Sequence, residues 1–143
     1  MVEFLKTLLA LQGALILAAS LLGGVFYAQA IRKEEREVAW RVVHSGGSMA
    51  GVMLLAFVPI IPLLALPTWG LHCFVWSFSL GTWLLVIGMN IAAFTGNRGL
   101  ERGGSPLNQL VRRLYSIGTA FSFVGVAFLL VGLVLSLSIR YQG

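Results

Sequence analysis

Three long stretches of the sequence contain no charged residue, and they constrain the fold more than any other feature. They cover residues 7–31, 42–97 and 114–139 and are 25, 56 and 26 residues long. A transmembrane helix needs about 20 consecutive apolar residues, so the middle stretch is long enough for two helices. Three prolines between residues 59 and 67 interrupt that stretch and place a turn in it. The sequence therefore predicts an all-α protein, a four-transmembrane-helix bundle with spans over residues 5–30, 42–64, 71–95 and 112–139.

The composition agrees with a membrane location. Hydrophobic residues make up 58% of the 143 residues and charged residues only 10%, which is too little polar surface to cover a water-soluble globule. We therefore expect a single domain, residues 1–143, that is integral to the inner (cell) membrane and whose solvent is the lipid bilayer. The net charge of +5 would favour nucleic acid as a partner of a soluble protein, but here the charges flank the spans, so no nucleic acid is expected.

The basic residues also predict how the chain is oriented. Eight of the ten lie between the first and second or the third and fourth predicted spans: Arg32, Lys33, Arg36, Arg41, Arg98, Arg102, Arg112 and Arg113. Cytoplasmic loops carry an excess of Lys and Arg, so both charged loops are predicted in the cytoplasm and both termini outside.

The first span ends in "YAQA", which is similar to a signal cleavage site. Its apolar core, however, is longer than the roughly 7 to 15 residues of the apolar core of a signal peptide, so we expect this segment to be a membrane span.

Polar side chains gather near the predicted cytoplasmic ends of the spans. A rise of about 1.5 Å per residue places them in one layer, which contains Tyr27, His44, Ser45, Ser48, Asn90, Tyr115, Ser116 and Thr119, together with Met89. Polar groups at such depths tend to face a cavity or the interior of the bundle. Interhelical hydrogen bonds are an alternative role for the serines and Thr119, and an interfacial belt is one for the two tyrosines.

His44 is followed by small residues along one face of its predicted helix. Gly47, Ser48 and Gly51 stand three, four and seven residues after it. Such a face lets another membrane helix approach closely, as in GxxxG pairs. A second interpretation is that a flat macrocycle lies there, with His44 as the ligand of its metal.

Two arginines extend the second interpretation. Arg41 stands one turn before His44, and Arg98 follows the third span at the same predicted depth. Guanidinium groups pair well with carboxylates, so these two side chains are candidates to bind the two propionates of a haem. The candidate cofactor contacts are therefore His44, Gly47, Ser48, Gly51, Arg41 and Arg98.

At these residues the sequence resembles the styrene oxide isomerase family. The similarity rests on Trp40 four residues before the histidine, on "HSG" at residues 44–46, on Gly51, and on "NRGL" at residues 97–100 after the third span. The resemblance implies a homotrimeric membrane protein that binds haem b, with His44 as the axial ligand of the iron. It also implies that the ferric iron acts as a Lewis acid that converts a hydrophobic aryl epoxide into an aldehyde.

The sequence departs from the family's pattern at two positions. Ala50 stands where the family has an asparagine six residues after its histidine, and Met89 or its neighbour Gly88 stands where the family has a tyrosine on the third span. The resemblance implies that these positions face the epoxide. Asn90 is adjacent to Met89 but points about 100° away from it on a helix. The predicted pocket positions are therefore Ala50, Met89 and Asn90.

Two other functions stay open from the sequence. An electron-transfer cytochrome needs two axial ligands, and His72 stands at the other end of the bundle, about 30 Å from His44 along a helix. Met89, from the third span or from a neighbouring subunit, is the remaining candidate for a second ligand. A cofactor-free membrane subunit that is held together by glycine faces is the other alternative.

Overall fold

The computed structural model describes residues 1–102 and 104–141, and its regular secondary structure is helical. It contains four α-helices and one short 3-10 helix, with no strand: α1 (Val2–Lys33), α2 (Glu37–Phe57), η1 (Ile61–Leu63), α3 (Thr68–Thr95) and α4 (Pro106–Tyr141). The predicted all-α class is confirmed. Helices α1, α3 and α4 are long and apolar enough to cross a membrane, and α2 is not among them.

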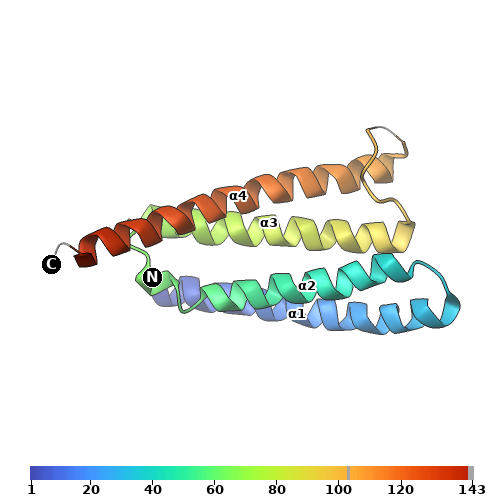
Figure 1. Ribbon diagram of the computed structural model, residues 1–143, viewed down its shortest axis with the longest axis horizontal. Coiled ribbons are helices and arrows are strands. Elements are labelled where there is room, and N and C mark those ends of the chain that lie inside the picture. Colours follow the sequence, from blue (N-terminus) through green and yellow to red (C-terminus); the bar gives the residue numbers. More distant parts are fainter. Residues whose placement is uncertain (103, 142–143) are drawn as a thin grey trace.

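The helices lie alongside one another, with the chain ends at one end of the bundle (Figure 1). The turn at residues 34–36 and the loop at residues 96–102 and 104–105 lie together at the opposite end, called here the loop end. Most of the basic residues therefore gather at the loop end, as the sequence predicts. The first, third and fourth predicted spans fall within α1, α3 and α4.

The second helix is shorter than predicted. α2 begins before residue 42 and ends at Phe57, whereas the prediction extended the helix to residue 64. The Val58 N–H bonds to the Leu55 carbonyl three residues back, and Pro59 cannot donate a backbone hydrogen bond. The chain then forms η1 and turns onto α4, where the Ala65 N–H donates to the Gly132 carbonyl at 3.2 Å.

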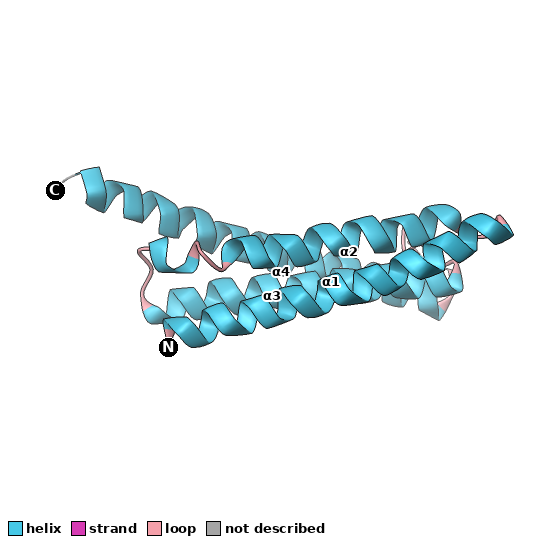
Figure 2. Ribbon diagram, turned by 90° about the horizontal axis from the view of Figure 1, so that it is seen from below, coloured by secondary structure: helices cyan, strands magenta, loops and turns pink. Residues whose placement is uncertain are grey.

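The bundle consists of two helix pairs. α1 packs mainly along α2, and α3 mainly along α4, while the contacts between the pairs are smaller (Figures 1 and 2). Both pairs are held close by glycines: a Cβ added to Gly51 would lie 2.8 Å from the Gly13 carbonyl oxygen, and one added to Gly81 would lie 2.8 Å from the Gly118 carbonyl oxygen. The backbones of each pair are therefore in contact, as in other small-residue membrane interfaces.

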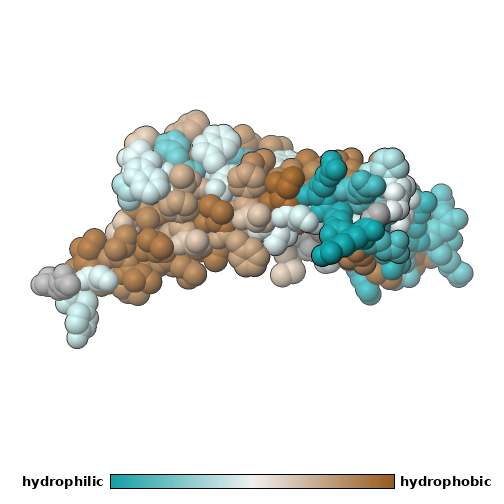
Figure 3. All heavy atoms as spheres, turned by 90° about the horizontal axis from the view of Figure 1, so that it is seen from above, coloured by the Kyte–Doolittle hydropathy of each residue, from teal (hydrophilic) through white to brown (hydrophobic). Residues whose placement is uncertain are grey.

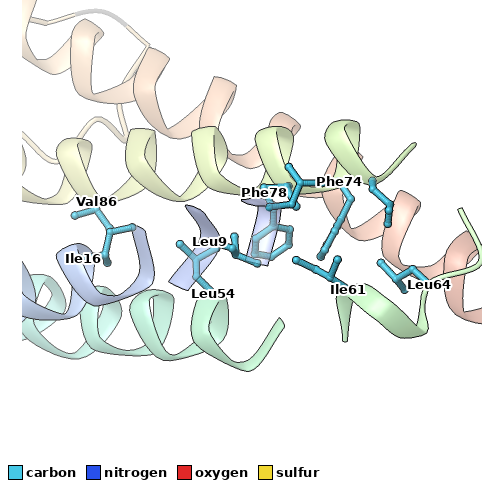
Figure 4. Close-up of a cluster of buried hydrophobic side chains, with 11 residues drawn as sticks. Leu9, Ile16, Leu54, Ile61, Leu64, Phe74, Phe78 and Val86 are labelled. Atoms are coloured by element: carbon cyan, nitrogen blue, oxygen red, sulfur yellow. The ribbon is translucent and has the colours of Figure 1, made fainter. Parts of the chain in front are cut away.

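An aliphatic and aromatic core joins the two pairs toward the end that holds the termini. Its buried side chains come from α1, α2, η1 and α3 (Figure 4), and they include Leu9, Leu54, Ile61, Phe74 and Phe78. Ring contacts link Phe57 of α2 to Phe74 and Phe78 of α3. The outer face of α4 is uncovered: only 11% of the most apolar window of this helix is buried. Figure 3 shows this side as largely hydrophobic away from the loop end.

Candidate functional site

His44 lies on α2 and is held by a hydrogen bond to α1. Its Nδ1 is 3.0 Å from the Ser20 carbonyl oxygen. A carbonyl oxygen only accepts, so Nδ1 must carry a proton, and in the neutral ring Nε2 is then the nitrogen with the free lone pair. This is the arrangement in which a histidine serves as a metal ligand with its other nitrogen fixed by a backbone carbonyl.

Ser20 is the centre of this contact, although no pattern in the sequence singles it out. Its buried hydroxyl donates to the His44 carbonyl at 2.5 Å and lies 2.6 Å from the Ser48 hydroxyl. Because each hydroxyl has one proton, Ser48 donates to Ser20 while Ser20 donates to His44. Ser20 therefore contacts His44 through both its side chain and its backbone, and the predicted interhelical role of Ser48 is confirmed.

A glycine on α1 makes room for the imidazole ring. A Cβ on Gly24 would lie 2.9 Å from the His44 Nδ1 and 3.1 Å from its Cε1, so a larger residue would push the ring away. His44 itself is only partly buried. His44, Ser48 and Leu55 share one side of α2 by helical spacing, and this side lies against α1 at Gly24, Ser20 and Gly13.

The small residues after His44 pack against α1. A Cβ on Gly47 would lie 3.0 Å from the Ser20 Cβ, and a Cβ on Gly51 would lie 2.8 Å from the Leu17 backbone nitrogen. In this chain Gly47 and Gly51 therefore serve the approach of another helix, which was the first of the two interpretations. The space beside them, where the second interpretation placed a macrocycle, is filled by α1.

The two predicted arginine contacts are exposed. Arg41 lies one turn before His44 on α2, where its carbonyl accepts a 2.8 Å hydrogen bond from the Ser45 hydroxyl. Arg98 lies in the loop after α3. Within residues 1–102 and 104–141 the ion pair formed is that between Lys6 and Glu3, near the N-terminus. Both guanidinium groups are thus available to an external anion at the loop end.

The predicted pocket positions lie on the other side of α2. A Cβ on Gly46 would be 3.0 Å from the Met89 sulfur, and both Ala50 and Met89 pack against the core between α2 and α3. The Asn90 side chain donates to the Val86 carbonyl of its own helix at 2.9 Å. The structure therefore does not bring Ala50, Met89 or Asn90 to His44 within one chain.

Residues of the predicted polar layer nevertheless lie at the same height along the bundle. Three glycine contacts cross it in turn, Gly24 with His44, Gly46 with Met89, and Gly88 with the Tyr115 ring. His44, Met89 and Tyr115 thus lie at one level on successive helices. His72, in the first turns of α3, lies at the opposite end, so a pairing of the two histidines within one chain is excluded as predicted.

Trp40, one turn before His44, is buried in an aromatic cluster at the loop end. Its ring is 4.8 Å from that of Phe26 and 4.7 Å from that of Phe94, measured between centroids. These rings line a hollow of about 270 Å³ together with Lys33 and Arg36. The Arg36 guanidinium donates to the Phe94 carbonyl, so the α1–α2 turn is fastened to the C-terminal end of α3.

The "NRGL" segment is a loop that lies on the start of α4. Gly99 has a φ of +69°, and a Cβ there would lie 2.7 Å from the Val111 Cγ1. The Gly99 N–H donates to the Asn108 side-chain oxygen at 2.8 Å, and the Ser105 hydroxyl donates to Asn97 at 2.7 Å. The segment therefore fixes the α3–α4 connection, and Arg98 is carried on a well-anchored loop.

Comparison with known proteins adds one finding. A model of a family described as styrene oxide isomerase matches residues 5–136. The match includes α2 and α3 completely and most of α1 and α4. A comparison with curated proteins gives no match.

Proposed function

The chain belongs to the styrene oxide isomerase family, and we propose that it is a membrane haem b protein that isomerises a hydrophobic epoxide, an aryl epoxide above all, to an aldehyde. The observation that supports this proposal most strongly is the hydrogen bond between the His44 Nδ1 and the Ser20 carbonyl. It leaves the Nε2 as a neutral imidazole donor, which is a common axial ligand of haem iron.

The residues around His44 fit a haem better than a bare metal ion. Within residues 1–102 and 104–141 there is no group of three or more His, Cys, Asp or Glu side chains that could hold an ion. A haem iron needs only one or two protein ligands, because the macrocycle supplies four. Arg41, one turn before His44 on α2, is exposed and would bind a propionate at the edge of the cofactor, whereas the Ser48 hydroxyl is bonded to Ser20 of α1.

The proposed chemistry is Lewis-acid catalysis without a redox partner. When bound at His44, a ferric haem would supply an electron-withdrawing centre for the epoxide oxygen. The conversion of an epoxide to an aldehyde moves a hydride within the substrate, so neither NAD(P)H nor oxygen is consumed. The chain's own contribution is to orient the imidazole through Ser20 and to surround the reaction with apolar side chains, which exclude the water that would give a diol.

The position of His44 also supports the proposed homotrimer. The His44 side chain is only partly buried, although its side of α2 lies against α1, and the pocket positions Ala50 on α2 and Met89 on α3 pack against the hydrophobic core instead. A haem on the His44 Nε2 needs a further surface to complete an apolar pocket. We propose that a neighbouring copy of the chain provides that surface.

We further propose that all four helices cross the inner membrane, with both termini outside. α1 and α3 run in the same direction, from the end with the termini to the loop end, so the chain must return between them through α2 and η1. The concentration of basic residues at the loop end supports a cytoplasmic position for that end. A reporter that is active only in the cytoplasm, fused after residue 143, should be inactive, and activity of that fusion would reverse the orientation.

The activity is tested with the purified protein and an aryl epoxide, in the absence of NAD(P)H and oxygen. We expect an aldehyde as the product and its loss in His44→Ala, with His72→Ala as the matched control that keeps the activity. The rate is expected to be low, because Ala50 and Met89 stand where the family resemblance implies polar groups and pack in the core of their own chain, and a lost polar contact in a dry site costs about 10²-fold. Haem-loaded protein that converts no epoxide, even with Asn at position 50 and Tyr at position 89, would overturn the isomerase function.

A further inference from the structure

A second concave surface lies on α4, away from His44. It is a groove of about 480 Å³ at the loop end, lined by Arg102, Gln109, Arg112, Arg113, Ser116 and Ile117. Five of these residues belong to the first turns of α4, and Arg102 comes from the loop before it. Figure 3 shows hydrophilic atoms gathered at this end of the α4 side.

The groove carries uncompensated positive charge. None of its three arginines forms an ion pair in the described parts of the chain, where the pair formed is Lys6 with Glu3. The segment from residue 98 to residue 113 contains four arginines and one glutamate, which gives a net charge of +3. The α1–α2 turn at the same end, residues 32–37, contains three basic and three acidic residues and is neutral. The groove therefore presents a net positive surface to anions from outside the chain.

The groove continues into an apolar stripe along α4. Ile117 lines the groove and is 48% exposed, and Val124 and Val131 follow it at seven-residue spacing with 45% and 52% exposure. Residues seven apart lie on nearly the same side of a helix. Gly118, Gly125 and Gly132 contact α3 and the segment after η1, so the stripe lies on a different side of α4 from these contacts.

From these observations we propose that the groove binds the head group of an anionic phospholipid, whose acyl chain lies along the stripe. Guanidinium groups bind phosphate oxygens by paired hydrogen bonds, and basic pockets at the cytoplasmic side of membrane helices bind anionic head groups. A free phosphate would use the arginines and leave the stripe without a role. The lipid class is identified by the combination of three cations with an adjoining apolar surface.

The proposal is tested by lipid titration of the detergent-purified protein, with bound lipid counted by native mass spectrometry. Phosphatidylglycerol and phosphatidylcholine with identical acyl chains are compared on the wild type and on Arg112→Gln/Arg113→Gln. Each arginine near an anionic head group contributes about fivefold in affinity, so the double variant should bind phosphatidylglycerol about 30-fold more weakly. The wild type should prefer phosphatidylglycerol, and inorganic phosphate in large excess should not displace it.

Two further variants control the test. Arg32→Gln/Lys33→Gln removes the same charge at the same end but outside the groove, and it should weaken binding less than about threefold, because exposed charges are screened by salt. Arg102→Gln changes only an exposed loop residue, keeps α4 intact, and should weaken binding about fivefold. Equal losses in the two double variants, equal affinity for the two lipids, or displacement by phosphate would overturn the proposal. It would also be overturned if Arg112→Gln/Arg113→Gln lowered the oligomer mass while lipid binding stayed the same, because the groove would then be a contact between copies of the chain.

Discussion

The two helix pairs pack by the same device but use their polar side chains differently. Gly13 and Gly51 bring α1 against α2, and Gly81 and Gly118 bring α3 against α4 at similar distances. Between α1 and α2, Ser20, Ser48 and the His44 ring bond across the interface. In the α3–α4 pair, Thr82 and Ser122 donate to the carbonyl four residues back in their own helices.

This difference distinguishes a helix contact that only packs two helices from a contact that also forms a candidate site. A glycine contact explains how two membrane helices approach, and both pairs have it, so it does not by itself indicate function. A serine that bonds its own helix satisfies its hydroxyl without defining a partner. Only the α1–α2 contact fixes the orientation and the tautomer of a titratable ring, and this makes it the candidate site.

The largest expected effect comes from forcing each pair apart. In Gly51→Val the new Cβ would meet the Gly13 and Leu17 backbones at 2.8 Å, and in Gly81→Val it would meet the Gly118 and Ser122 backbones at 2.8 Å. Both variants should lose about 3 kcal/mol of stability through overpacking, measured as a lower thermal unfolding temperature in detergent. Only Gly51→Val should also lose its haem. Equal haem loss in both folded variants would remove the distinction between the pairs.

A smaller effect is expected from the serines. Ser20→Ala removes the hydroxyl that joins the His44 carbonyl to Ser48 and keeps the backbone carbonyl that accepts from the ring. The loss of these buried hydrogen bonds loosens the α1–α2 register that aims this carbonyl at Nδ1, and it costs about 1 to 2 kcal/mol, roughly tenfold. The expected result is about tenfold weaker haem retention, measured by transfer of haem to apomyoglobin. The matched change Ser122→Ala breaks only a bond within α4 and should leave haem retention unchanged. A comparable loss in Ser122→Ala would show that general loosening, not the Ser20 contact, is responsible.

Much of this architecture follows from the sequence, and the parts that do not have physical reasons. Charge-free runs and the placement of the basic residues predict the helices and their loop end, because lipid leaves a chain few alternatives. The end of α2 at Phe57 was missed, because apolar composition continues past it while Pro59 ends the hydrogen-bond pattern. Ser20 was missed because its role depends on the register between α1 and α2. The same register decides that Gly47 and Gly51 face α1, which periodicity alone leaves open.

The smallest expected effect concerns Met89, on the other side of α2 from His44. Its sulfur packs against Gly46, so it cannot ligate an iron at His44 of the same chain. Met89→Ala should therefore leave the spin state and the Soret position of the oxidised protein unchanged. A change from low-spin to high-spin iron in this variant would instead indicate ligation by Met89 of a neighbouring subunit, and with it an electron-transfer cytochrome.

The most direct test of the account is the absorption spectrum of the detergent-purified wild type, His44→Ala and His72→Ala. If His44 holds a haem iron with an open sixth position, the oxidised wild type and His72→Ala should show the Soret band of high-spin ferric haem that binds added imidazole. His44→Ala should remain inserted in the membrane and lose the band. A colourless wild type, or a His44→Ala protein with full haem content, would contradict the central claim.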